Sequence, residues 1–292
     1  MRADRSEAGG RTASFAHPLR PSGTSPISAP SEARMGEAGR GKRIDMAKKT
    51  KAVVLGVGAE RGLGAAASRR FAKEGHHVLV AGRTAGKIEK VAQSIRANGG
   101  SATPLTVDGT KEEEVIALFD KAMADDADGA PADLAVFNMG NNAAVDIREM
   151  TAQHFEDSWR VGCFAGFLFG REAVRRLSTL GRGTVIFTGA SGSLRGKPRF
   201  AAFNATKGGL RLLVQSLARE FGPQGIHVAH AIIDGGIEGE RLLSRLPDRK
   251  EKAGADGLLN IEAIADSYWH LHRQHRSAWT HEIDLRPYKE PF

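Results

Sequence analysis

The sequence contains few cysteines and few tyrosines. Its single cysteine, Cys163, cannot form a disulfide within the chain, and metal sites built on several thiolates are excluded with it. Such a chain is typical of a reducing compartment, so we expect a cytoplasmic protein. The two tyrosines, Tyr268 and Tyr288, both lie near the C-terminal end. Most of the chain therefore has no phenolic hydroxyl to offer for proton transfer.

Long apolar runs and basic clusters are also missing. No apolar segment approaches the ~20 residues that cross a bilayer, so no membrane partner is expected. The net charge is +8, but no long Lys/Arg run is interleaved with aromatic residues, which argues against a nucleic-acid partner. Among ten histidines, His270, His272 and His275 fall on one predicted helix. We interpret them as a polar helix face, so no metal site is predicted.

Residues 1–45 differ in composition from the rest of the chain. Ser, Gly, Pro and Arg dominate this segment, and Phe15 is its one aromatic residue. It cannot bury enough apolar surface to offset the entropy of ordering, so we expect a disordered extension. An organelle transit peptide stays open, although the acidic residues argue against it. Alternatively, "MAKKTKAVVLG" indicates a translation start at Met46. Residues 46–292 are predicted to form a single domain.

Apolar runs alternate with amphipathic helical patterns from Lys51 onward. The predicted strands are 51–57, 76–82, 101–108, 132–138, 183–189, 226–233 and 281–287. Most are continuously apolar, as in parallel strands buried on both faces. The alternation predicts an α/β fold, a doubly wound parallel sheet of about seven strands of Rossmann-like type. Thr110 is expected to cap the helix that begins with a glutamate-rich turn.

A glycine-rich turn follows the first predicted strand and opens the first helix. In "VVLGVGAERGLG", Gly58, Gly62 and Gly64 are spaced G-x-x-x-G-x-G, with Leu63 between the last two. Small residues let backbone amides approach a pyrophosphate, and the helix N-terminus adds free N–H groups and partial positive charge. A tight turn without a ligand is the alternative. The position at a strand–helix junction favours nucleotide binding.

Over residues 50–287 the chain resembles the short-chain dehydrogenase/reductase family. Asp108 closes the third strand, where the family places a carboxylate near the adenine. "FNMGNN" resembles the family's Asn-Asn-Ala-Gly motif after strand four, with Asn138 and Gly140 matching best. The resemblance implies a nicotinamide dinucleotide, a small-molecule substrate and a homodimer or homotetramer.

The residues after the second strand bear on the choice of dinucleotide. NAD binders usually carry an Asp or Glu there that bonds the ribose 2′-OH. This chain reads "LVAGRT", with no carboxylate. Arg83 could pair with a 2′-phosphate, and Arg61 in the glycine turn could add a second cation. We therefore expect NADP(H) over NAD(H), while either arginine could be a solvated surface charge.

The family's catalytic groups are a tyrosine, a lysine four residues later, a serine and an asparagine. Lys207 in "FNATKGGL" matches the lysine. Phe203 stands at the tyrosine position, Ala190 at the serine position and Gly162 at the asparagine position. A slip of one residue would make Ser191 the serine, so Lys207 and Ser191 are the catalytic candidates. A phenyl ring has no titratable proton, and losing a general acid typically costs ~10²–10⁴-fold in rate.

Three functions remain open at this point. The first is an NADP(H)-dependent oxidoreductase with altered proton chemistry, in which His230 or Asp234 near the end of strand six could replace the missing acid. The second is a catalytically degenerate nucleotide-binding protein. The third is a non-redox enzyme on the same fold, because fold does not fix function. Residues 239–257, charged and poorly patterned, are the expected lid over the site.

Overall fold

The structure is a computed structural model and describes residues 48–291. The predicted extension 1–45 and the proposed start at Met46 lie outside the described residues. Among residues 48–291, every helix is too short or too polar to cross a membrane.

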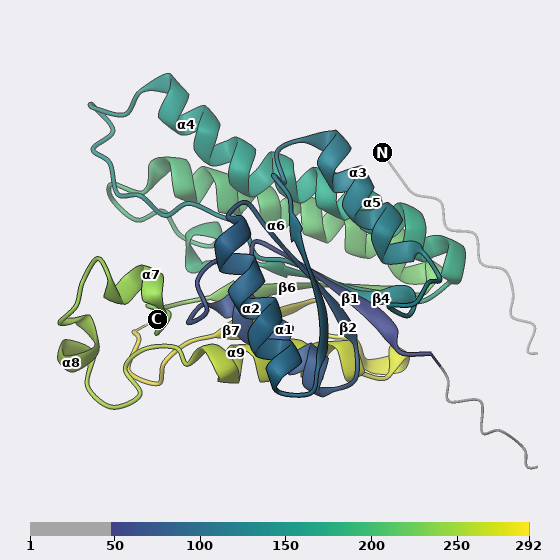
Figure 1. The fold of residues 1–292 in the computed structure, drawn as a ribbon. Coiled ribbons are helices and arrows are strands. Elements are labelled where there is room, and N and C mark those ends of the chain that lie inside the picture. Colours follow the sequence, from purple (N-terminus) through teal and green to yellow (C-terminus); the bar gives the residue numbers. More distant parts are fainter. Residues whose placement is uncertain (1–47, 292) are drawn as a thin grey trace, which may run out of the picture. The chain divides into compact units, whose positions relative to one another are not determined.

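A seven-stranded parallel sheet forms the centre of the described chain (Figure 1). Its strands are β1 (Thr50–Leu55), β2 (His77–Gly82), β3 (Ser101–Thr106), β4 (Ala130–Phe137), β5 (Gly183–Thr188), β6 (Ile226–Ile233) and β7 (Glu282–Leu285). Their order in the sheet is β3-β2-β1-β4-β5-β6-β7. All seven predicted strands are confirmed, each within a few residues of its expected bounds.

Helices cover both faces of the sheet. They are α1 (Leu63–Lys73), α2 (Ala85–Ala97), α3 (Glu112–Met123), α4 (Ala152–Trp159), α5 (Ala165–Leu180), α6 (Ala201–Phe221), α7 (Glu240–Leu243), α8 (Arg249–Ala253) and α9 (Ile261–Arg273). Helices α1, α2 and α9 pack on one face, and α3, α5 and α6 pack on the other (Figure 1). The predicted doubly wound fold is therefore confirmed.

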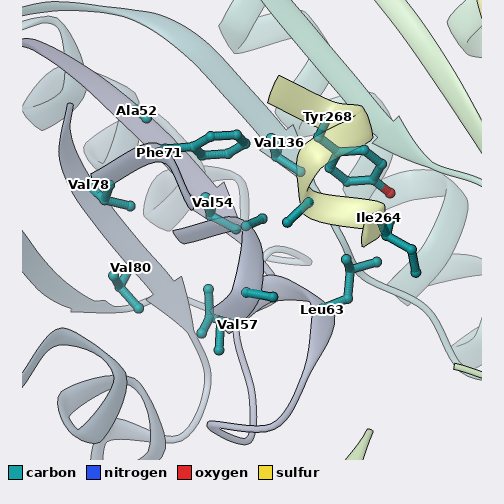
Figure 2. Close-up of a cluster of buried hydrophobic side chains, with 14 of the residues drawn as sticks. Ala52, Val54, Val57, Leu63, Phe71, Val78, Val80, Val136, Ile264 and Tyr268 are labelled. Atoms are coloured by element: carbon teal, nitrogen blue, oxygen red, sulfur yellow. The ribbon is translucent and has the colours of Figure 1, made fainter. Parts of the chain in front are cut away.

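The two cores follow from the alternation of side chains along each strand. In β1, Ala52 and Val54 enter one core, while Val53 and Leu55 enter the other. The first core holds Phe71 of α1, which is fully buried (Figure 2). Truncating such a phenylalanine to alanine typically costs about 3–5 kcal/mol.

The start of α3 differs from the prediction. Thr110 does not cap this helix, which begins at Glu112 after Lys111. The backbone N–H and hydroxyl of Thr110 both donate to Asp108 Oδ1, at 3.0 and 2.8 Å. Glu114 Oε2 accepts from the backbone N–H of Asp108 at 2.6 Å. The expectation was wrong because the helix begins one residue later, with Lys111 at the cap position, while Thr110 forms a local turn with Asp108.

Candidate functional site

The candidate site lies where the strand order changes direction. The chain runs outward from β1 to β2 and β3, then returns to place β4 on the other side of β1. In such sheets the carboxyl ends of the central strands leave a crevice at this point, and ligands bind there. The glycine-rich turn follows β1, and Asn138 follows β4. Asn138 Nδ2 donates to the carbonyl of Gly56 at 3.3 Å, which ties the two strand ends together.

The three glycines of the turn have different surroundings. A Cβ on Gly64 would lie 3.0 Å from Val57 Cα and 3.1 Å from Asn138 Nδ2, so glycine allows α1 to approach the strand closely. A Cβ on Gly62 would lie 3.0 Å from the Ala59 carbonyl oxygen. A Cβ on Gly58 would meet no atom within 4 Å. Gly58 therefore presents bare backbone to open space, as close approach by a ligand requires.

The N-terminus of α1 is prepared for an anion. Gly62 supplies no side-chain cap, and the first turn contains no acidic residue. Leu63, the first residue of the helix, is buried and fixes the helix against the sheet. The first N–H groups of α1 thus keep their partial positive charge for a phosphate. These features fit the pyrophosphate of a dinucleotide.

The two cationic candidates, Arg83 and Arg61, follow β2 and lie in the glycine turn, respectively. Arg83 directly follows β2 and is exposed. Arg61 is also exposed, and its guanidinium is 3.8 Å from the carboxylate of Glu238. Surface pairs of this kind contribute little and rearrange readily. Arg61 would therefore lose little by leaving Glu238 for an added phosphate.

Asp108 is held at the end of β3. Burial alone would raise its pKa, but hydrogen bonds from Thr110 and the charges of Arg83 and Lys111 bring the pKa below its usual value. The carboxylate is therefore ionised at neutral pH. Because the positive charge of Arg83 contributes to this lowered pKa, the two predicted cofactor residues lie near each other.

Lys207 is buried between the ends of β4 and β5. Its Nζ donates to the carbonyl of Thr188 at 2.7 Å and to that of Met139 at 3.2 Å. A Cβ on Gly140 would lie 3.3 Å from Nζ, so glycine leaves room for the ammonium. Burial, reinforced by the positive charge of Arg241, lowers the pKa of Lys207 to about 8. Lys207, Gly140, Asn138 and the glycine turn thus form one continuous site.

Phe203 lies one helical turn before Lys207 on α6. Its ring meets Phe200 edge-on, with centroids 6.5 Å apart. A Cβ on Gly192 would come within 3.1 Å of the Phe203 ring, so the loop after β5 packs against it. The ring offers no hydrogen-bonding group at the place where α6 meets the site.

Gly162 lies in the π-helical turn Arg160–Phe164, between α4 and α5. A Cβ there would come within 2.3 Å of the Thr206 methyl carbon. Real Cβ atoms essentially never come within 3.0 Å of another heavy atom. The methyl group of Thr206 therefore fills the space into which any longer side chain at this position would extend.

Ser191 follows β5, and its hydroxyl is near enough to Asp234 to help lower the pKa of that carboxyl group. Asp234 is fully buried and accepts two hydrogen bonds from the guanidinium of Arg195, each 2.9 Å long. Arg286 forms a second ion pair with the same carboxylate at 3.0 Å. Asp234 is thus neutralised by two arginines. Its pKa lies below the usual value despite burial, because Ser191 and the arginines stabilise the carboxylate.

His230 is fully buried on β6. Its Nδ1 is 2.9 Å from Glu282 Oε2, and Arg211 forms a two-pronged ion pair with the same carboxylate. Burial lowers the pKa of His230 to about 4. A Cβ on Gly189 would clash with the His230 ring, so the backbone of Gly189 covers it. Neither His230 nor Asp234 has an open face toward solvent.

Tyr268 lies closer to the site than its position in the sequence indicates. It is fully buried on α9 (Figure 2). Its hydroxyl is 2.8 Å from Thr188 Oγ1. The carbonyl of the same threonine accepts from Lys207. Burial raises the pKa of Tyr268 above its usual value. The phenol supports Thr188 from the opposite face of the sheet and is sealed from solvent.

The lid contributes residues that the sequence did not single out. Arg241 of α7 donates to the carbonyl of Gly140 at 3.1 Å. The backbone N–H of Glu240 donates to the carbonyl of Arg61 at 2.8 Å. The predicted lid therefore touches both the glycine turn and the loop after β4. No local motif marks Arg241, because only the folded chain brings α7 to that loop.

Comparison with known proteins agrees with this geometry. The short chain dehydrogenase family matches residues 52–246. The chain therefore belongs to this family and is an oxidoreductase of the short-chain dehydrogenase/reductase type.

Individual relatives span most of the described chain. Elsinochrome reductase 1 of Elsinoe fawcettii is 29% identical over 187 residues, which are 64% of this chain and 68% of the relative. A short-chain dehydrogenase from Rhodopseudomonas palustris has a crystal structure that is 36% identical, with a TM-score of 0.69, covering 82% of this chain and 99% of that one. The crystal structure of a metagenomic short-chain oxidoreductase in complex with NADP is 23% identical, with a TM-score of 0.67. It covers 82% of this chain and 97% of that one.

Proposed function

We propose that this chain is an NADP(H)-dependent oxidoreductase whose proton transfer does not use a tyrosine. The observation that carries the proposal is Lys207, buried at the junction of β4 and β5 with Phe203 one turn before it. A bound nicotinamide dinucleotide would supply the hydride. The open backbone at Gly58 and the uncapped N-terminus of α1 would hold its pyrophosphate.

NADP(H) is favoured over NAD(H) by charge. Arg83 is exposed directly after β2, Arg61 is exposed in the glycine turn, and the turn after β2 contains no carboxylate. A guanidinium pairs well with a 2′-phosphate, whereas a ribose 2′-OH is normally bonded by an acidic residue. One charge-assisted contact is worth about 1.5–3 kcal/mol, or roughly 10–100-fold in affinity.

We assign the substrate proton to the ammonium of Lys207. A general acid works best when its pKa lies near the operating pH, and burial brings the pKa of Lys207 to about 8. Two of its three N–H groups are held by backbone carbonyls, so one remains for the substrate side. His230 and Asp234 are weaker candidates because both are fully buried and paired.

The experiment is turnover of NADPH and NADH against carbonyl, enone and imine panels, with affinities measured by fluorescence. We expect NADPH oxidation and tighter binding of NADPH than of NADH. Arg83→Ala should weaken NADPH binding roughly tenfold or more and leave NADH binding unchanged. Arg219→Ala, an exposed arginine near the far end of α6, is the matched control. Equal affinities for the two nucleotides in wild type would contradict the NADP(H) preference.

A second candidate is a nucleotide-binding protein without catalysis. The observations that favour it are the phenyl ring of Phe203 and the space beside Gly162, which the Thr206 methyl fills. It predicts tight NADPH binding, no turnover in wild type, and new activity in Phe203→Tyr. If wild type turns over and Phe203→Tyr slows it, this candidate is wrong. Product formation without any change in NADPH absorbance would indicate a non-redox enzyme instead.

A further inference from the structure

Three potential metal ligands converge at the edge of the sheet opposite the candidate site. His76 directly precedes β2, Asp133 lies in the first half of β4, and His272 lies in the last turn of α9. Each offers one ligand atom, and all three atoms lie within 4.8 Å of one another. Because the strands are parallel, their amino ends lie at the edge farthest from the glycine turn. The cluster is therefore separate from the dinucleotide crevice.

Neighbouring groups hold these side chains in place. His76 Nε2 is 3.1 Å from Asp133 Oδ1. Thr184 Oγ1 is 3.0 Å from His272 Nδ1. In the tautomer whose Nδ1–H donates to this hydroxyl, Nε2 carries the lone pair that a metal ion needs. Thr50 hydrogen-bonds the Asp133 carboxylate. Partners of this kind orient ligands in known metal sites and are usually needed for full affinity.

The cluster has an apolar wall and an open side. The ring of Trp269 lies 5.8 Å from that of His76 and 5.3 Å from that of His272. A cavity of about 460 Å³, lined in part by Asp133 and His272, opens beside it. Arg182 approaches Asp133 at 3.8 Å, but its side chain is exposed and free to turn away. An ion and a water ligand can therefore enter from this cavity.

We propose that His76, Asp133 and His272 bind a divalent transition metal ion, with zinc the best match. Two imidazoles and one carboxylate are a common donor set for zinc, and a water from the cavity would complete the coordination. The ion replaces the proton that His76 and Asp133 share. Zinc–ligand distances of ~2.1 Å require ligand atoms about 3.4 Å apart. The His76 and Asp133 ligand atoms, 3.1 Å apart, are already this close. The ligand atom of His272 must therefore approach by up to about 1.4 Å from the 4.8 Å limit, and His272 is on the terminal turn of its helix.

The test uses protein without a histidine tag, titrated with cobalt(II) and with zinc(II). We expect one equivalent of cobalt to give visible absorption bands and to quench tryptophan fluorescence through Trp269, and zinc to compete for the site. His272→Gln and Asp133→Asn should each weaken binding at least tenfold. His270→Gln is the matched control, because His270 is exposed on the same helix.

A further variant separates ligation from folding. Thr184→Val removes only the hydroxyl that orients His272, so we expect weaker cobalt binding with an unchanged circular-dichroism spectrum. The proposal is overturned if wild type gives no cobalt bands, or if His270→Gln loses as much affinity as His272→Gln. A crystal of the zinc-loaded protein whose anomalous zinc peak lies away from His76, Asp133 and His272 would overturn it as well.

Discussion

The close approach of Gly162 to Thr206 gives a prediction whose size follows from the structure. Replacing Gly162 with alanine places a Cβ 2.3 Å from the Thr206 methyl carbon. Overpacking of a buried site typically costs about 1–3 kcal/mol. Alanine in a helix interior is favoured over glycine by about 1 kcal/mol, which offsets part of that cost. We expect Gly162→Ala to lower the free energy of unfolding by a net amount of about 0–2 kcal/mol.

The same geometry predicts what relieves the clash. Thr206→Ser removes the methyl group, after which the nearest atom to a Cβ at position 162 is Thr206 Cβ at 3.7 Å, an ordinary contact. Thr206→Ser alone should cost about 0.8 kcal/mol for one buried methyl. In that background Gly162→Ala should be neutral or stabilising by up to about 1 kcal/mol. The coupling energy between the two sites is then about 1–3 kcal/mol.

Equilibrium urea unfolding of the four proteins in this cycle, followed by circular dichroism, measures the coupling. Gly208→Ala is the matched control, because a Cβ there meets no atom within 4 Å. It should raise stability by up to about 1 kcal/mol. If Gly162→Ala has the same effect with threonine and with serine at position 206, the methyl group is not the obstacle and the reasoning fails.

Three further predictions concern charge and proton transfer. Lys207→Arg keeps a cation but cannot release a proton near neutral pH, so carbonyl reduction should be lost while NADPH still binds. In wild type, the rate of reduction should fall as pH rises through about 8, where Lys207 loses its proton. A rate that does not change with pH across that range contradicts the assignment. The pKa of His230 is lowered to about 4 by burial, so the unfolded chain binds an extra proton below pH about 6.5. Urea midpoints should therefore fall between pH 6.5 and 4, with a smaller fall in His230→Gln. The pKa of Glu282 is lowered to about 2, mainly by its hydrogen bonds with Arg211. The stability that this pair contributes should be lost as pH drops from about 4.5 to 2. Glu282→Gln should therefore be less stable than wild type at pH 7, and its stability should change less in acid.

The sheet could be predicted because the signals for it are local. The strands β1, β2, β5 and β6 bury both faces, so their apolar runs are continuous and the ends of the runs are marked by turns. The glycine turn was recognisable for the same reason, since Gly58, Gly62 and Gly64 lie within one short segment. A side chain at Gly62 or Gly64 would meet nearby backbone, whereas Gly58 faces open space.

The contacts that the sequence did not reveal join residues far apart in the chain. The pairs Arg195–Asp234 and His76–Asp133 depend on the strand order, which no single segment specifies. His272 was expected on a polar helix face, yet it packs toward Thr184 and Trp269. Helical spacing could not show this, because histidine is compatible with both surroundings.

The departures around Lys207 depend on one another. On the proposed alignment Phe203 lacks the hydroxyl and Gly162 lacks the amide, and the Thr206 methyl occupies the space where that amide would begin. The hydroxyl of Ser191 lies near the carboxylate of Asp234. A tyrosine introduced at position 203 would therefore restore the phenol without restoring the asparagine. On the proposed function, Lys207 is the group placed to deliver the proton, because its ammonium is buried between the ends of β4 and β5 with one N–H left for a substrate.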